Sequence, residues 1–181
     1  MEIKELSLKG VFEITPKVFD DARGFFFEAF NEVTFRSAGL PYHFLQDNQS
    51  YSSKGVLRGL HFQRAPFAQG KLVRVLRGSI IDVVVDLRKG SDSFGKHLLI
   101  PLDSDKRNMV YVPVGFAHGF VTLEDSMVMY KCTNVYDKNS DGGIRWNDPD
   151  LGIDWGTSHP VLSEKDAALP CLKDVIDDLA F

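Results

Sequence analysis

The sequence predicts a mostly-β protein, a barrel or jelly roll with one or two short helices outside it. Short β-like runs separated by turn residues fill the middle of the chain, and helical spacing is confined to two short segments. Strands that follow one another without intervening helices favour antiparallel sheets over alternating strand–helix units. With 181 residues and 44% apolar content, we expect residues 1–181 to form a single domain with a substantial core.

Six segments carry the strand signal, and turn pairs such as Gly78-Ser79 and Lys89-Gly90 separate them. The predicted strands are residues 72–77, 80–87, 97–102, 109–112, 119–123 and 127–133. Two peripheral helices are predicted at residues 31–38, ending at Gly39, and at residues 172–179, where apolar residues recur at helical spacing.

A closed barrel of this kind can hold one small ligand in its interior. Strand alternation predicts which side chains face that interior. Val128, Tyr130 and Cys132 share one face of their strand. Asp82 and Asp86 share a face of theirs, and two carboxylates on an otherwise apolar strand need partners or water if they are buried.

The composition argues against several classes of protein. A formal net charge of −4 is unusual for a nucleic-acid binder, although a few converging Arg and Lys can still bind a small phosphorylated ligand. Cys132 and Cys171 form no CxxC motif, which is typical of reduced thiols. The N-terminus lacks a signal-peptide pattern, and no apolar run approaches the ~20 residues of a membrane span. We therefore expect a cytoplasmic protein without a membrane or nucleic-acid partner.

The densest polar segment, residues 45–63, contains His61 between Leu60 and Phe62. Partial burial there favours the neutral imidazole that a general base requires, although a hydrogen-bonded core histidine explains the same pattern. Arg58 lies three residues earlier, so strict alternation places it on the opposite face, pointing to solvent. A bulge at Gly59 would instead bring the cation and the base to one face.

Three further residues have both a structural and a catalytic interpretation. Lys71, at a strand entry, is either a solvated strand end or an inward cation that stabilises developing negative charge. Tyr130, among apolar neighbours, is either a core tyrosine or a general acid. Asp166 has nearly the spacing of a capping box with Ser163, and it could equally orient a histidine.

His118 is either a second cavity residue or a turn residue. Residues 21–28 (DARGFFFE) suit a nucleotide base with its phosphates, or equally an amphipathic edge strand. Metal binding is the obvious rival for a barrel with histidines, but His61 is followed by Phe62-Gln63, so the HxH motif is absent, and a scattered three-histidine site is the remaining option. The sequence contains neither a Walker-type loop nor GxGxxG.

Taken together, these segments resemble the dTDP-4-dehydrorhamnose 3,5-epimerase family over nearly the whole chain. Each piece is short, but the ordered set is specific. The matching strings are DARGFFFE (21–28), QDNQS (46–50), VLRGLHFQ (56–63), QGKLVRV (69–75), DVVVDLR (82–88), VPVGFAHGF (112–120), YKCT (130–133), GIRWNDP (143–149) and LSEKD (162–166).

The resemblance implies a cupin-type jelly roll, a homodimer, and an isomerase that uses no metal and no cofactor. It implies that His61 is the base, that Asp166 orients it, that Tyr130 is the acid and that Lys71 stabilises an enolate. A site of this family can borrow residues from the partner subunit. The implied substrate-binding residues are Arg23, Phe26, Glu28, Gln46, Asn48, Arg58, His118 and Tyr136.

The implied reaction inverts C3 and C5 of dTDP-4-dehydro-6-deoxy-D-glucose to give dTDP-4-dehydro-L-rhamnose, for dTDP-L-rhamnose biosynthesis. The same residues serve a mono-epimerase that inverts one carbon of a related sugar. Two other readings remain open, a metal-dependent cupin and a non-enzymatic sugar-nucleotide binding module.

Overall fold

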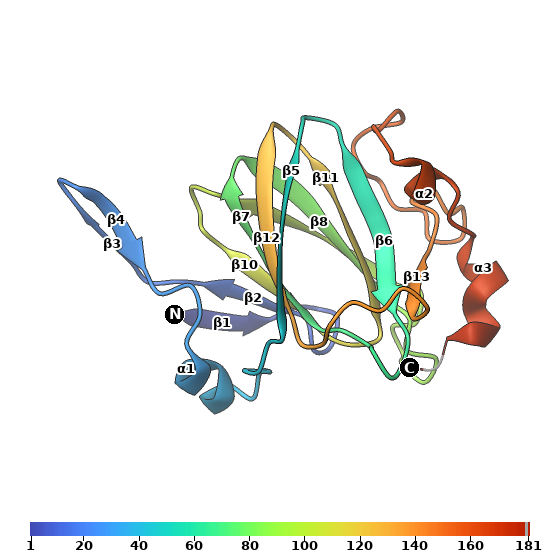
Figure 1. The fold of residues 1–181 in the computed structure, drawn as a ribbon, viewed down its shortest axis with the longest axis horizontal. Coiled ribbons are helices and arrows are strands. Elements are labelled where there is room, and N and C mark those ends of the chain that lie inside the picture. Colours follow the sequence, from blue (N-terminus) through green and yellow to red (C-terminus); the bar gives the residue numbers. More distant parts are fainter. Residues whose placement is uncertain (180) are drawn as a thin grey trace.

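Two antiparallel sheets face each other in the computed structural model, which describes residues 1–179 and 181 (Figure 1). The helical segments are α1 (Glu32–Ser37), α2 (Glu164–Ala167), α3 (Leu172–Val175) and the 3₁₀ turn η1 (Ile176–Asp178). The strands are β1 (Glu2–Glu5), β2 (Phe12–Thr15), β3 (Val18–Asp21), β4 (Gly24–Phe27), β5 (Gln46–Ser52), β6 (Leu57–Gln63), β7 (Lys71–Arg77), β8 (Ser79–Asp86), β9 (His97–Asp103), β10 (Met109–Val112), β11 (Phe116–Thr122), β12 (Ser126–Cys132) and β13 (Asp141–Gly143).

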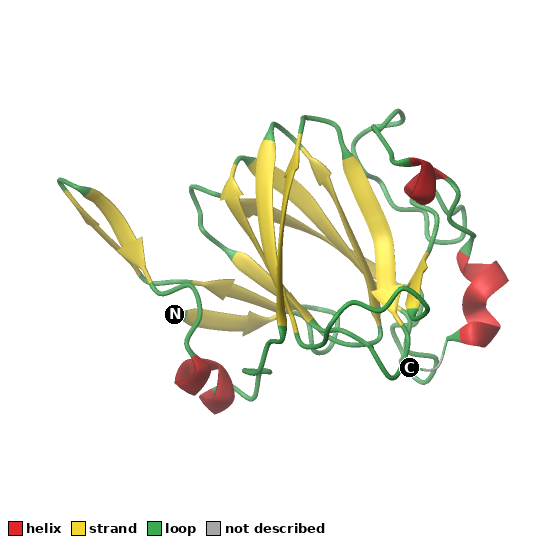
Figure 2. Cartoon of the chain, in the orientation of Figure 1, coloured by secondary structure: helices red, strands yellow, loops and turns green. Residues whose placement is uncertain are grey.

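One sheet has the order β1-β2-β10-β7-β12-β5, and the other has the order β13-β6-β11-β8-β9. Neighbouring strands within each sheet pair antiparallel, and several neighbours are far apart in sequence, such as β6 with β11 and β5 with β12. The helices lie only at the periphery, drawn in red in Figure 2. This architecture confirms the predicted mostly-β jelly roll with a few short helices outside it.

The six predicted strands are confirmed with small shifts at their ends, the largest at β11, which begins at Phe116. The predicted helix at residues 31–38 is α1, and the Asn31 side chain caps it by accepting hydrogen bonds from the backbone N–H groups of Val33 and Thr34. The predicted helix at residues 172–179 is confirmed in place but is divided into α3 and η1.

Alternating side chains on the strands pack into separate apolar clusters on the two sides of each sheet. The cluster between the sheets includes Val73, Ile80, Val84 and Val128, and the partly buried Tyr130 packs against it. A second cluster joins the outer face of the five-stranded sheet to the C-terminal helices, and a third packs α1 under the six-stranded sheet. The inner cluster therefore fills one part of the barrel and leaves the rest for polar residues.

The β3–β4 hairpin pairs only with itself and projects from the barrel on the side opposite α2 and α3 (Figure 1). Its aromatic side chains are exposed, with Phe26 at 69% of its full accessibility. No helix among residues 1–179 and 181 is long and apolar enough to span a membrane.

Candidate active site

A bulge in β6 turns two polar side chains toward the barrel interior. His61 pairs with His118 of β11, and Arg58 pairs with Phe120. The step from one pair to the other is three residues along β6 and only two along β11, so β6 contains one extra residue. Gly59 makes this possible, because it adopts a positive φ of 119° and an added Cβ would lie 2.6 Å from the Cα of Gly119. The bulge brings Arg58 and His61 into the same cavity, as the sequence analysis proposed for Gly59.

The polar end of the barrel contains two adjoining cavities of about 270 and 300 Å³, and the same four side chains line both. Those four are His61, Lys71, Tyr130 and Lys165. Nine of the twelve residues predicted for the site line one or both cavities. They are His61, Lys71, Tyr130, Asp166, Arg58, His118, Gln46, Asn48 and Tyr136.

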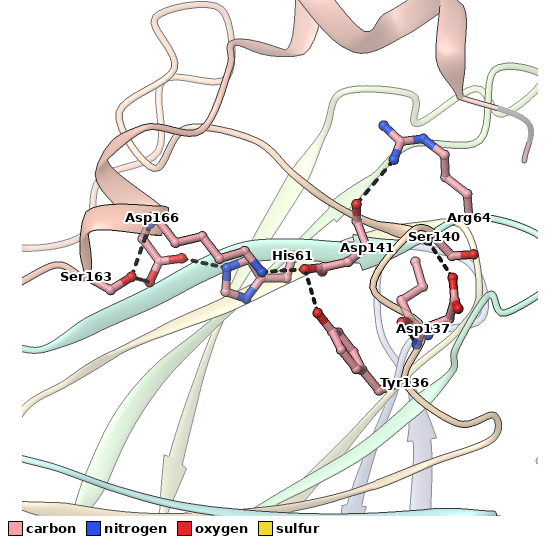
Figure 3. Close-up of polar contacts among 10 residues, drawn as sticks. His61, Arg64, Tyr136, Asp137, Ser140, Asp141, Ser163 and Asp166 are labelled. Atoms are coloured by element: carbon pink, nitrogen blue, oxygen red, sulfur yellow. Dashed lines mark hydrogen bonds and ion pairs between the residues drawn. The ribbon is translucent and has the colours of Figure 1, made fainter.

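His61 and Asp166 form a close pair although they lie 105 residues apart in the sequence. Asp166 Oδ1 is 2.6 Å from Nε2 of His61, and the Ser163 hydroxyl donates to Asp166 Oδ2 at 2.9 Å. Figure 3 shows Ser163 and Asp166 together on one side of the His61 ring. Ser163 also caps α2 by accepting the Asp166 N–H, so one short turn contains both the helix start and the carboxylate that contacts His61.

The chemistry of this pair determines which ring nitrogen of His61 keeps its lone pair. Burial alone would raise the pKa of Asp166, but the hydrogen bonds from His61 and Ser163 and the nearby Lys165 charge outweigh it, and the pKa is lowered. Asp166 is therefore ionised at neutral pH and can only accept hydrogen bonds. His61 Nε2 accordingly carries the hydrogen, which leaves the Nδ1 lone pair available to remove a proton.

Lys71 and Tyr130 lie close together on neighbouring strands, with the Lys71 ammonium 5.9 Å from the Tyr130 ring centre. Burial lowers the pKa of Lys71, and the nearby Cys132, Asp82 and Asp141 partly oppose that shift. Burial also raises the pKa of Tyr130, with Cys132 adding to the effect and Arg58 opposing it. The phenol consequently stays protonated at neutral pH and can act as a proton donor.

Polar side chains along β5 continue the cavity wall. Gln46 donates to Asn48 at 3.0 Å and accepts the backbone N–H of Tyr136 at 2.8 Å. Two hydrogen bonds fix the Arg58 side chain. Its Nε donates to Ser52 Oγ at 2.9 Å, and its Nη2 donates to the carbonyl oxygen of Tyr51. These bonds fix a guanidinium and two amides at the cavity, a combination suited to phosphate oxygens.

Three predicted binding residues, Arg23, Phe26 and Glu28, do not line either of these two cavities. Arg23 and Phe26 are on the projecting β3–β4 hairpin, where Arg23 pairs with the exposed Asp21 at 2.6 Å. Glu28 accepts a hydrogen bond from Asn31 at the start of α1. One copy of the chain therefore does not bring residues 21–28 to its own site.

Residue-by-residue reasoning missed a charged pair at the cavity. Lys165 forms a short ion pair with Asp141, and the Tyr136 hydroxyl lies 3.3 Å from the same carboxylate (Figure 3). In the sequence, the position of Lys165 directly before Asp166 was the feature that could have indicated its place at the site. Asp141 had no comparable signal, because it reaches the cavity only through the pairing of β13 with β6.

Within the described part of the chain, no group of three or more His, Cys, Asp or Glu side chains is arranged to hold a metal ion. His61 and His118 lie side by side, but each has its own aspartate partner, Asp166 and Asp82.

A mostly-β jelly roll whose cavity joins an imidazole–carboxylate pair to an amine and a phenol contains the groups that an acid–base enzyme requires. Residues 5–174 match the family described as dTDP-4-dehydrorhamnose 3,5-epimerase. The chain belongs to this family, and it is an isomerase of the epimerase type.

Individual relatives agree with that assignment. The dTDP-4-dehydrorhamnose 3,5-epimerase of Methanothermobacter thermautotrophicus is 51% identical over 164 residues, which is 88% of each chain. The solved rmlC epimerase of Mycobacterium tuberculosis has a TM-score of 0.94 at 44% identity, covering 98% of this chain and 92% of that one. The RmlC of Legionella pneumophila, solved in complex with dTDP-4-keto-L-rhamnose, has a TM-score of 0.91 at 42% identity, covering 95% and 93%.

Proposed function

We propose that this protein inverts C3 and C5 of dTDP-4-dehydro-6-deoxy-D-glucose, giving dTDP-4-dehydro-L-rhamnose for dTDP-L-rhamnose biosynthesis. The observation that carries the proposal is the His61–Asp166 pair, which shares a cavity with Lys71 and Tyr130. Membership of the epimerase family, and the sugar nucleotide bound by the Legionella relative, support the choice of substrate.

The first step is removal of a proton next to the ketone. The C4 carbonyl acidifies the hydrogens on C3 and C5, because the carbanion is delocalised onto oxygen as an enolate. His61 takes the proton on Nδ1, and the Asp166 carboxylate stabilises the imidazolium that results. The side chain of His61 is 30% exposed, so the captured proton can exchange with solvent.

The second step returns a proton to the opposite face of the same carbon. Lys71 stabilises the enolate oxygen from a fixed position, which avoids the cost of reorienting water. Tyr130 then delivers its phenolic proton, and the carbon is inverted. The phenolate regains a proton and His61 loses one by exchange with solvent, so the same two groups can act on the second carbon. Two groups on opposite faces are needed, because a single group that returned its own proton would restore the starting configuration.

Recognition of the diphosphate is assigned to Arg58, Gln46 and Asn48, which the protein already holds in place. His118 and Tyr136 complete the substrate contacts at the cavity wall. No metal and no cofactor enters the proposed reaction. The cytoplasmic location and the single epimerase domain spanning residues 1–181 stay predictions.

A homodimer supplies the remaining binding residues in this proposal. Arg23, Phe26 and Glu28 are absent from the chain's own cavity, and the hairpin that carries Arg23 and Phe26 is exposed and projects from the barrel. A second copy of the chain that received the hairpin would bury its aromatic side chains and gain a cation for the nucleotide. The complete site would then contain side chains from both subunits.

The decisive test is deuterium incorporation into dTDP-4-dehydro-6-deoxy-D-glucose in heavy water, read separately at C3 and C5 by NMR. The proposal expects deuterium at both carbons, and a reductase that traps the product should yield the doubly inverted sugar. Incorporation and inversion at one carbon only would identify a mono-epimerase. Absence of incorporation would favour a binding module, and elemental analysis showing a tightly held transition metal would favour a metal-dependent cupin.

A further inference from the structure

The cavity contains a second imidazole–carboxylate pair beside the first. His118 faces His61 directly across the β6–β11 pairing, and its Nε2 lies 2.7 Å from Oδ2 of Asp82 on β8. The Asp82 side chain is completely inaccessible, and His118 is 7% exposed where it lines the cavity. The acid–base steps above involve Asp82 only as one of the charges that oppose the lowering of the Lys71 pKa.

The surroundings of Asp82 are unfavourable for a purely structural carboxylate. It lies on the inner face of β8 between Ile80 and Val84, both members of the apolar cluster between the sheets. Its Oδ1 atom is buried and has no hydrogen-bond partner among residues 1–179 and 181. A buried polar atom without a partner opposes folding, so this oxygen does not add to the stability of the fold.

Asp86, two positions further along the same face, shows what a structural carboxylate looks like in this strand. It is equally inaccessible, but Arg88, Ser91 and Ser93 all donate to its oxygens. It does not line the cavity that contains His118. The two aspartates therefore differ in the number of their partners and in their access to the cavity, and only Asp82 acts on a cavity residue.

The geometry determines what His118 can offer a ligand. A carboxylate only accepts hydrogen bonds, so Nε2 of His118 carries the hydrogen and its Nδ1 keeps a lone pair. Lys71, Arg58 and Lys165 bring only donors to the same cavity. A diphosphate has acceptor oxygens and matches those cations, whereas a sugar hydroxyl has a hydrogen to donate and matches Nδ1.

We propose that Asp82 is a positioning residue that holds His118 with the Nδ1 lone pair toward the cavity, where His118 accepts a hydrogen bond from a hydroxyl group of the substrate's sugar ring. The inference rests on the proposed function for the identity of that sugar. His118 is a binding group here and not a second base. A base must release its captured proton to solvent between turnovers, and His118 is far less exposed than His61.

The test combines two variants with a matched control. Asp82→Asn keeps the shape of the side chain but removes the charge that favours one tautomer. His118→Gln keeps a donor for Asp82 but lacks the acceptor at the Nδ1 position. Asp86→Asn is the control, since it removes an equally buried carboxylate from the same strand face.

Affinity for dTDP is measured by calorimetry, and kcat/KM is measured with the dTDP-4-dehydro sugar. Asp82→Asn and His118→Gln should each lower kcat/KM about tenfold, while the Kd for dTDP stays within about twofold. Asp86→Asn should lower the Tm, but it should change neither kcat/KM nor the Kd for dTDP relative to the other. Equal loss of dTDP affinity and kcat/KM in Asp82→Asn, or a matching change in the control, would overturn the proposal.

Nitrogen-15 NMR of the ligand-free protein reads the His118 tautomer directly. Wild type should carry the hydrogen on Nε2, and Asp82→Asn should show a mixture of tautomers. A wild-type hydrogen on Nδ1 would refute the positioning role whatever the substrate. If the wild-type protein catalyses no deuterium exchange at C3 or C5, the proposed function fails. The tautomer of His118 would still show whether Asp82 positions it. Loss of exchange at a single carbon in His118→Gln would make His118 a second base, contrary to the proposal.

Discussion

The barrel cavity and the β3–β4 hairpin both carry residues expected to bind the substrate, but they do so under opposite conditions. In the cavity, His61 and Asp166 are held by hydrogen bonds from neighbouring elements. On the hairpin, Arg23 has 90% of its side chain exposed, and its partner Asp21 lies two residues away on the same hairpin. The groups proposed for acid–base chemistry therefore lie together within one chain, whereas some of those proposed to bind the nucleotide lie outside its cavity.

The contrast teaches that chemistry and recognition have different structural requirements. Proton transfer depends on distances fixed to a fraction of an ångström, and strands of a closed barrel provide that precision. A hairpin that pairs only with itself instead extends its side chains away from the barrel. Variants in the two regions should therefore differ in which kinetic constant they change.

The largest effect is expected in the cavity, from His61→Ala. Loss of the general base should lower kcat by about 10⁴-fold and abolish deuterium exchange at both C3 and C5. Binding of dTDP should be little affected, and calorimetry supplies that control. Near wild-type exchange in heavy water by this variant would refute the assignment of His61.

Removal of the acid should give a smaller and more selective effect. Tyr130→Phe keeps the ring and its packing against the inner apolar cluster but removes the proton donor. We expect exchange to persist while formation of the doubly inverted sugar falls by roughly 10²-fold. The two rates are compared by NMR in one reaction. If the variant still makes the inverted product at full rate, Tyr130 is not the acid.

The hairpin variant Arg23→Ala/Phe26→Ala should mainly raise KM, by about tenfold to a hundredfold, because it removes a charged contact and a stacking surface. Steady-state kinetics checks the expected small change in kcat. Loss of kcat with unchanged KM would place these residues near the reacting carbons instead.

Co-expression of the Arg23→Ala/Phe26→Ala chain with the His61→Ala chain tests whether the hairpin of one subunit contributes to the cavity of the other. In a mixed dimer, one cavity of the two would combine an intact His61 with the partner's intact hairpin. About half of randomly assorted dimers are mixed, so about a quarter of the wild-type kcat/KM should return. The two variants purified separately serve as the controls. Absence of any recovery, with mixed dimers verified by differential tags, would mean that each hairpin serves its own chain.

The smallest expected effect concerns the pH dependence of stability in the two regions. The pKa of Asp166 is lowered in the folded protein, so its ionised form stabilises the fold above its unfolded-state pKa, and this contribution is lost as pH falls through the folded value. Asp166→Asn should cost about 1 kcal/mol at pH 7 and flatten the fall in Tm below about pH 4.

The control is Asp21→Asn on the hairpin. The pKa of Asp21 is also lowered, by hydrogen bonds from Arg23, but this pair lies at the surface and is screened by salt. The Tm of this variant should depend on pH as the wild-type Tm does at physiological ionic strength. An equal flattening in both variants would show that burial does not distinguish the two regions.

Local signals predicted those parts of the fold and the site that depend on neighbours in the sequence. Strand alternation grouped Tyr130 with Val128 on one face, and both lie at the inner apolar cluster. The spacing of Ser163 and Asp166 predicted a helix start. Glycine at position 59 indicated the bulge. Each of these follows from backbone preferences within a few residues.

The other features depend on how distant segments meet, which periodicity does not encode. The contact of Asp166 with His61 and the approach of Asp141 to Lys165 arise from the path of the C-terminal segment across β6. Residues 21–28 looked suited to a nucleotide, but the self-paired hairpin takes Arg23 and Phe26 out of the chain's own cavity. Composition indicated what that segment can bind, but not which copy of the chain would use it.

The extra residue in β6 has a consequence for how this enzyme can diversify. Arg58 and His61 share one short stretch of backbone, so a change that moves the proposed anchor for the phosphates should also move the proposed base. Adaptation to sugars of another shape must therefore come from the opposite wall of the barrel or from the hairpin. A library for altered selectivity would leave residues 58–61 constant and vary the walls around them.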